Sequence, residues 1–86
     1  MELERIRRLT KEERENLNID DLTMSEMKAV IEETILSETN FKIAKLRFLK
    51  LKNAEKIAEF LGYDSRTVVA RIKFIKERFK NTIINI

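Results

Sequence analysis

The stretch Asn53–Phe79, NAEKIAEFLGYDSRTVVARIKFIKERF, decides the fold of this chain. Apolar residues recur at helical spacing on both sides of Gly62, the only glycine in the sequence. Glycine adopts a positive φ at little cost, so it commonly follows the last residue of a helix. The pattern predicts a helix over about 54–61, a tight turn, and a second helix over about 65–79. The apolar positions that carry this prediction are Ile57, Ala58, Leu61, Val68 and Ile72.

The last predicted helix has two distinct faces. Successive helical residues are rotated by about 100°, so residues that share a face can be read from the sequence. The inner stripe is Val68, Ile72, Ile75 and Phe79, and the opposite side carries Arg66, Ala70, Lys73 and Glu77. Small residues at Ala58 and Gly62 are expected to let the two helices cross closely. The spacing is therefore typical of a helix-turn-helix, in which one helix can enter a DNA groove.

The rest of the chain also predicts helices. Two Thr-x-x-Glu capping boxes, Thr10–Glu13 and Thr23–Glu26, mark helix starts, the second opening a helix to about Ser37. A further amphipathic helix with a basic outer side is expected over about 41–50. We therefore expect an all-α fold of four or five short helices, with a loop over 16–22 and no assignment for the tail 82–86. The apolar stripe expected between Thr23 and Ser37 is Met27, Val30, Ile31 and Ile35, which Leu36 could extend.

Length and charge indicate one small domain over 1–86 with two unlike parts. Residues 1–39 carry six Lys/Arg against eleven Asp/Glu, a net charge of −5. Residues 40–86 carry twelve Lys/Arg against four Asp/Glu, a net charge of +8. We therefore distinguish an acidic helical part, 1–39, from a basic helix-turn-helix part, 40–80. A basic surface around such a motif favours a partner with a phosphate backbone.

Composition argues against several other classes. The chain has no Cys and no His, so no disulfide, usual zinc site or His-based nucleophilic dyad is expected. The pair Asp20–Asp21 falls far short of a calcium-binding loop and is interpreted as a solvated turn. No apolar run is long enough to span a bilayer, and no apolar signal core follows MELERIRR. We expect a cytoplasmic protein that is not an enzyme, with no cofactor, metal, membrane or small-molecule substrate.

The segment KIAKLRFLKLKNAEKIAEFLGYDSRTVVARIKFIKERF resembles region four of bacterial sigma factors and the small sigma-like regulators of phages and conjugative elements. The features that carry the resemblance are KLRF, IAEFLGY and SRTV, and it covers about 41–79. It implies a transcription regulator that reads duplex DNA with helix 65–79, with RNA polymerase as a second partner. Carried over by position, Arg66, Thr67, Ala70 and Lys73 would face base edges, and Lys52, Asn53, Lys56 and Ser65 would approach phosphates.

One departure from the family pattern leaves a second function open. Where family members often have basic residues after the Thr-Val pair, this chain has Val69 and Ala70, followed by Arg71. Val69 and Phe74 fall on either flank of the inner stripe and are expected to be exposed. The alternative is a protein-interaction or self-association module that uses this apolar face and the tail, with a homodimer as one outcome.

Overall fold

The computed structural model describes residues 2–86, so Met1, the first residue of the expected domain, lies outside the described residues. The described part is helical and contains no strand, which confirms the all-α prediction. It holds six α-helices rather than four or five, because two short helices precede residue 16. In chain order the elements are α1 (Glu4–Arg7), α2 (Lys11–Glu15), the 3₁₀ turn η1 (Ile19–Asp21), α3 (Met24–Glu33), α4 (Glu38–Ala44), the π-helical turn η2 (Lys45–Leu49), α5 (Ala54–Leu61) and α6 (Ser65–Asn85).

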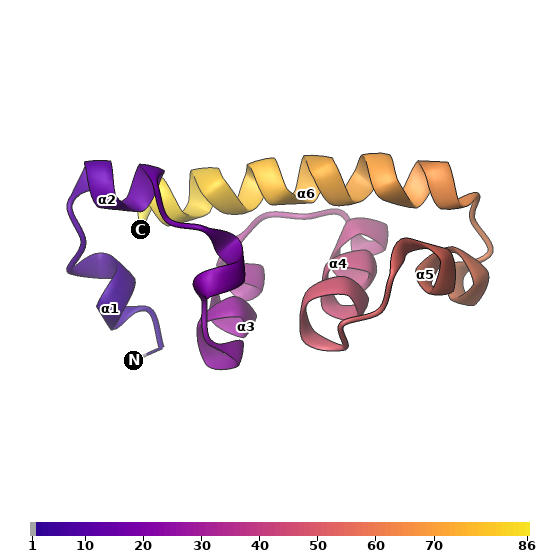
Figure 1. The fold of residues 1–86 in the computed structure, drawn as a ribbon, viewed down its shortest axis with the longest axis horizontal. Coiled ribbons are helices and arrows are strands. Elements are labelled where there is room, and N and C mark those ends of the chain that lie inside the picture. Colours follow the sequence, from indigo (N-terminus) through magenta and orange to yellow (C-terminus); the bar gives the residue numbers. More distant parts are fainter. Residues whose placement is uncertain (1) are drawn as a thin grey trace.

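The long helix α6 runs along one edge of the molecule, with α3, α4 and α5 below it and α2 beside its C-terminal end (Figure 1). The body measures 40 × 20 × 20 Å, and α6 contacts α2, α3, α4 and α5. The predicted inner stripe is confirmed, since Val68, Ile72, Ile75 and Phe79 are all buried. The ring of Phe79 meets that of Phe48 edge to face, with centroids 5.2 Å apart. The core therefore lies along the underside of α6.

Helix α6 continues to Asn85, six residues beyond the predicted end at Phe79. The unassigned tail thus belongs to this helix, and its Ile83 is buried. Arg14 explains how the end is held. Its Nη1 donates to the carbonyl oxygens of Ile84 (3.3 Å) and Ile86 (2.8 Å). The same guanidinium donates to the carbonyls of Ile6 (3.1 Å) and Arg7 (2.8 Å), so one cation caps the C-terminal ends of α1 and α6.

Helix α3 ends earlier than predicted. It stops at Glu33 instead of about Ser37, and Ile35, a member of the apolar stripe expected between Thr23 and Ser37, is 84% exposed. The cause is Thr34, whose hydroxyl donates to the Val30 carbonyl oxygen at 2.6 Å and lies 2.7 Å from the Thr82 hydroxyl of α6. This contact turns the chain out of the helix. The periodic pattern was therefore wrong at Ile35, because a tertiary contact overrides it.

Both capping boxes are confirmed, and the second carries an additional ion pair. The carboxylate of Glu26 accepts the Thr23 backbone N–H at 2.9 Å. It also accepts two bonds from the Arg5 guanidinium, from Nε and Nη2, both at 2.8 Å. Glu26 is 4% exposed. The Arg5 bonds hold the pKa of this carboxyl well below its ordinary value, at about 2. The N-terminal helix α1 is therefore fixed to α3.

The helix predicted over 41–50 begins at Glu38, three residues early, and its second half is a π-helical turn. Ser37 caps α4, and the chain then widens into the π-helical turn η2, where the Lys50 N–H donates to the Lys45 carbonyl oxygen at 3.0 Å. Leu51 follows with φ at 57°, a left-handed conformation that is uncommon for leucine. This bend separates η2 from α5, which allows α5 to turn back against α6.

Candidate nucleic-acid interface

Helices α5 and α6 are joined by a three-residue turn, as the sequence predicts. The amide oxygen of Asn53 accepts the Lys56 N–H at 2.8 Å and caps α5. At the other end, Gly62 has φ at 77°, and the N–H groups of Gly62 and Tyr63 both donate to the Ala58 carbonyl oxygen. A Cβ built on Gly62 would meet no atom within 4 Å. The expectation that Gly62 is small for close packing is therefore wrong, and its backbone conformation is the physical reason for glycine.

Asp64, rather than Ser65, caps α6. Its Oδ1 accepts the backbone N–H of Arg66 at 2.8 Å. The same carboxylate lies 3.3 Å from Arg66 Nε through Oδ1 and 3.5 Å from Arg66 Nη2 through Oδ2. The side-chain hydrogen bond from Arg66 lowers the pKa of Asp64 below its ordinary value. The first outward-facing cation of α6 is thus held by the residue that starts the helix.

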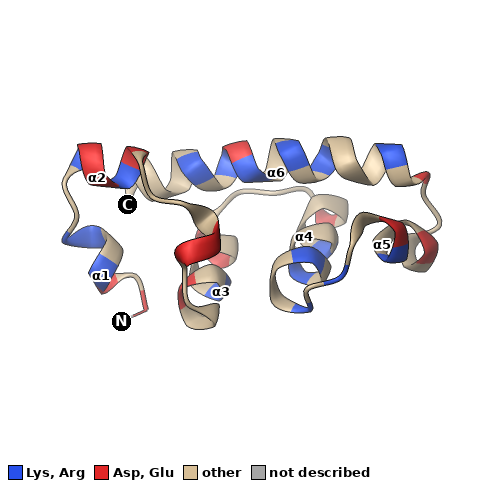
Figure 2. Cartoon of the chain, in the orientation of Figure 1, with Lys and Arg blue, Asp and Glu red and all other residues tan. Residues whose placement is uncertain are grey.

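The outer side of α6 is free of the other helices. Arg66 projects with 92% of its side chain exposed, and the remaining residues predicted to face outward, Ala70, Lys73 and Glu77, are also exposed. Figure 2 shows Lys and Arg recurring along this helix, interrupted by one acid, Glu77. The cations of α6 are Arg66, Arg71, Lys73, Lys76, Arg78 and Lys80. Of these, Arg66, Lys73 and Lys80 are exposed and can be reached by another molecule, whereas Arg71, Lys76 and Arg78 are half-buried.

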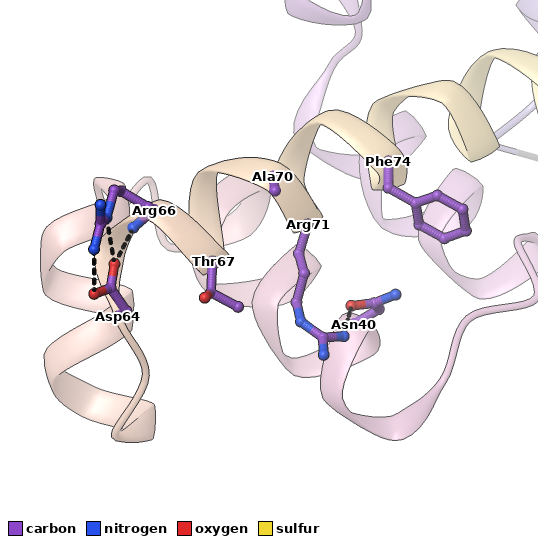
Figure 3. Close-up of a pocket in the computed structure, with 7 residues that line it drawn as sticks. All are labelled: Asn40, Asp64, Arg66, Thr67, Ala70, Arg71 and Phe74. Carbon is purple, nitrogen blue, oxygen red and sulfur yellow. Dashed lines mark hydrogen bonds and ion pairs between the residues drawn. The ribbon is translucent and has the colours of Figure 1, made fainter.

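A shallow hollow opens beside the first three turns of α6 (Figure 3). It brings together three of the predicted base-reading residues, Arg66, Thr67 and Ala70, but not Lys73, which projects elsewhere on the exposed side of α6. The other residues that line it are Asn40, Asp64, Arg71 and Phe74. The hollow therefore mixes cations, an aromatic ring and small side chains, which are groups that can contact phosphates and base edges.

Four residues of this hollow were outside the predicted DNA-binding set: Asn40, Asp64, Arg71 and Phe74. Arg71 Nη1 donates to the Asn40 side-chain oxygen at 3.1 Å, and its guanidinium lies 5.9 Å from the centre of the Tyr63 ring. The sequence could have indicated Arg71 as a site residue, because Arg71 is a cation that directly follows the predicted site residue Ala70. It could not have indicated Asn40, which is buried in α4, 31 residues before Arg71. The α4 side chain fixes the Arg71 guanidinium at the edge of the hollow.

The residues expected to approach phosphates are placed in two groups. Lys52, Asn53 and Lys56 are exposed around the start of α5, whereas Ser65 is half-buried in the first turn of α6. None of the four lines the hollow. Lys56 Nζ lies 3.8 Å from Glu59 Oε2, an exposed ion pair that contributes little to stability. The structure therefore does not gather these four side chains with the base-reading set.

Apolar side chains are also exposed on α6, as predicted. Val69 is 57% exposed and Phe74 is 52% exposed, with the Arg78 guanidinium 6.0 Å from the Phe74 ring centre. The tail, which the alternative function includes in the apolar interface, offers little exposed surface for one, because Ile83 is buried and Ile84 and Ile86 are half-buried. An apolar interface on this helix would therefore use Val69 and Phe74 rather than the tail.

Other kinds of site find little support in residues 2–86. No group of three or more Asp, Glu, His or Cys side chains in this range is placed to hold a metal ion. No helix in the same range combines the length and apolar character needed to cross a bilayer. No model of a known protein family matches the chain, and no curated protein or solved structure shows significant similarity to it.

Proposed function

We propose that this protein is a sequence-specific DNA-binding transcription regulator of sigma-factor region four type, which reads duplex DNA with α6. The observation that carries the proposal is the exposed outer face of α6, which begins at a tight helix-turn-helix and presents Arg66 and Lys73 to solvent. An α-helix with its side chains is about 10–12 Å wide, and the major groove of B-DNA is about 12 Å wide. The outer face therefore fits that groove without rearrangement of the core.

The side chains of this face suit distinct parts of a duplex. Arg66 can donate two hydrogen bonds to the O6 and N7 of guanine, whereas Ala70 can only contact a thymine methyl. Thr67 can bond to either base or phosphate, and Arg71, which also lines the hollow, would contact a phosphate in this arrangement. From Arg66 to Lys73 the helix rises about 10 Å, which corresponds to about three base pairs. We therefore expect the DNA sequence that α6 recognises to be short.

Replacing Arg66 with alanine is expected to weaken binding to the preferred duplex about tenfold or more, because one bidentate base contact is lost. Lys73 lies outside the hollow, so we assign it to a phosphate rather than a base edge; replacing it with alanine should weaken binding to all duplexes and reduce the slope of log K against log salt by about one. The preferred duplex is first obtained by selection from a random pool, and affinities are then measured by fluorescence anisotropy over a salt series.

Lys28→Ala is the matched control, since Lys28 is an exposed cation on α3 in the acidic part of the chain. It removes the same charge as Lys73→Ala but should leave affinity and salt slope nearly unchanged. Circular dichroism melts confirm that all three variants remain folded. If wild type, Arg66→Ala and Lys73→Ala bind DNA with equal affinity, the proposal that α6 reads the duplex is contradicted.

RNA polymerase is the second partner that the sigma-like proposal implies. A single reading helix of this length contacts few base pairs, so either polymerase or a second copy would be needed to hold the protein at a promoter. A homodimer would place two half-sites about one helical turn apart, 34–36 Å between centres. The spacing of the selected sequences therefore distinguishes the two arrangements: one short element indicates a monomer, and a repeated element indicates a dimer.

A second candidate function is favoured by the exposure of Val69 and Phe74. In this alternative α6 is an interface for self-association or another protein, and duplex binding is absent or secondary. The alternative predicts a sedimentation coefficient that rises with protein concentration, and Phe74→Ser should abolish the rise. A monomer at all concentrations that binds a selected duplex excludes this alternative.

A further inference from the structure

The ion pair between Asp64 and Arg66 lies on the surface of the protein, where an ion pair adds little to folding stability. Both groups are exposed, at 54% and 92% of their side chains, and exposed pairs contribute little to folding. The capping bond from the Arg66 N–H does not require a charge either, because asparagine and serine cap helices about as well as aspartate. The charge of the carboxylate is therefore not required to start α6, and this charge lies at the surface of the hollow.

The hollow shows what the carboxylate faces. Among the described residues that line it, Asp64 is the one acid, and it lies beside Arg66 at the start of α6 (Figure 3). Its two oxygens engage Nε and Nη2 of Arg66, the side of the guanidinium that would otherwise form a bidentate bond with a phosphate or a guanine. In the free protein Arg66, whose side chain is 92% exposed, is thus already paired.

We propose that Asp64 is a specificity-determining residue of the α6 face, which restrains Arg66 from phosphates and releases it only to a matching base edge. This inference rests on the proposed duplex-binding function. A phosphate offers Arg66 charge attraction, but it must also approach the Asp64 carboxylate, which repels it. A guanine edge is uncharged and offers two acceptors in a fixed geometry, so it replaces the carboxylate with less repulsion. The pair therefore weakens binding to arbitrary duplex more than binding to the preferred one.

The test is Asp64→Asn, which keeps an oxygen to accept the Arg66 N–H and removes only the charge. Glu77→Gln is the matched control, because it makes the same change of charge on the exposed face of the same helix, outside the hollow. Wild type and both variants are titrated against the duplex selected by wild type and against a scrambled duplex of equal length, over a salt series. Thermal melts establish that α6 is still formed in each variant.

Asp64→Asn is expected to tighten binding to the scrambled duplex about fivefold and binding to the selected duplex much less, so that the ratio of the two affinities falls at least about threefold. Glu77→Gln should tighten both equally and leave the ratio unchanged. If Asp64→Asn also tightens both duplexes equally, Asp64 acts as an ordinary surface charge and the inference is overturned. If wild type binds neither duplex, the proposed function itself fails, which is a separate result.

Discussion

Replacing Phe79 with alanine is expected to destabilise the protein by about 3–5 kcal/mol, which is the largest effect of any single substitution considered. Phe79 is fully buried, and its ring packs edge to face on Phe48 of η2. The substitution would remove the ring contact between α6 and η2, and it would leave a cavity there. A domain of 86 residues has a small core, so most of its stability would be lost.

Phe60→Ala is the control for this prediction. It makes the same chemical change in α5, but Phe60 is 77% exposed, so the expected change is within about 0.5 kcal/mol. Urea denaturation followed by circular dichroism measures both free energies of unfolding. A thermal melt should show the Phe79 variant lowered by about 12 °C or more. Similar losses in the two variants would show that the packing under α6 is not the main source of stability.

The second large effect is expected from the pH dependence of Glu26. Its carboxyl has a pKa of about 2 in the folded protein against an ordinary value of 4.5, with Arg5 as the main cause. Because the folded pKa is the lower one, the ion pair stabilises the protein fully above the unfolded value, and this contribution is lost as the pH falls from about 5 toward 2. Since Arg5 is half exposed and water screens it, we expect a contribution of about 2 kcal/mol at neutral pH.

Glu26→Gln tests this contribution. Glutamine can still serve in the capping box, so the variant isolates the charge. It should be less stable than wild type by about 2 kcal/mol at pH 7, and most of this difference should be lost by pH 2, where about half of the Glu26 carboxyl groups of the folded wild type are protonated. Glu13→Gln is the matched control, because Glu13 occupies the same position of the other capping box and is exposed. Parallel stability curves for wild type and Glu26→Gln between pH 7 and pH 2 would contradict the assignment.

Local signals in the sequence predicted the elements that depend on local chemistry. Both capping boxes, the positive φ of Gly62 and the inner stripe of α6 are confirmed, because each depends on residues within a few positions of one another. The faces of α6 follow from helical rotation alone, which is why the exposure of Arg66 and Lys73 could also be predicted.

The ends of α3 and α6 and part of the hollow were not predicted, because they depend on contacts between residues far apart in the sequence. Thr34 leaves α3 because of a contact with Thr82, 48 positions away, and the end of α6 is held by Arg14, which precedes it by about 70 positions. The pairing of Arg71 with Asn40 is a third long-range contact, and it shapes the edge of the hollow. A periodic pattern carries no information about such contacts, so the helix ends and the membership of the hollow could not be derived from it.

The order of the other helices along α6 also separates charge in space. Residues 2–39 and 76–86 gather toward the end of the molecule where α6 finishes and carry nine Lys/Arg against twelve Asp/Glu, whereas residues 40–75 gather toward the end where it starts and carry nine Lys/Arg against three Asp/Glu (Figure 2). The body is 40 Å long, about four Debye lengths at 0.1 M salt. The protein is therefore an electric dipole along its long axis, and the field of any polyanion would rotate it so that the Arg66 end arrives first.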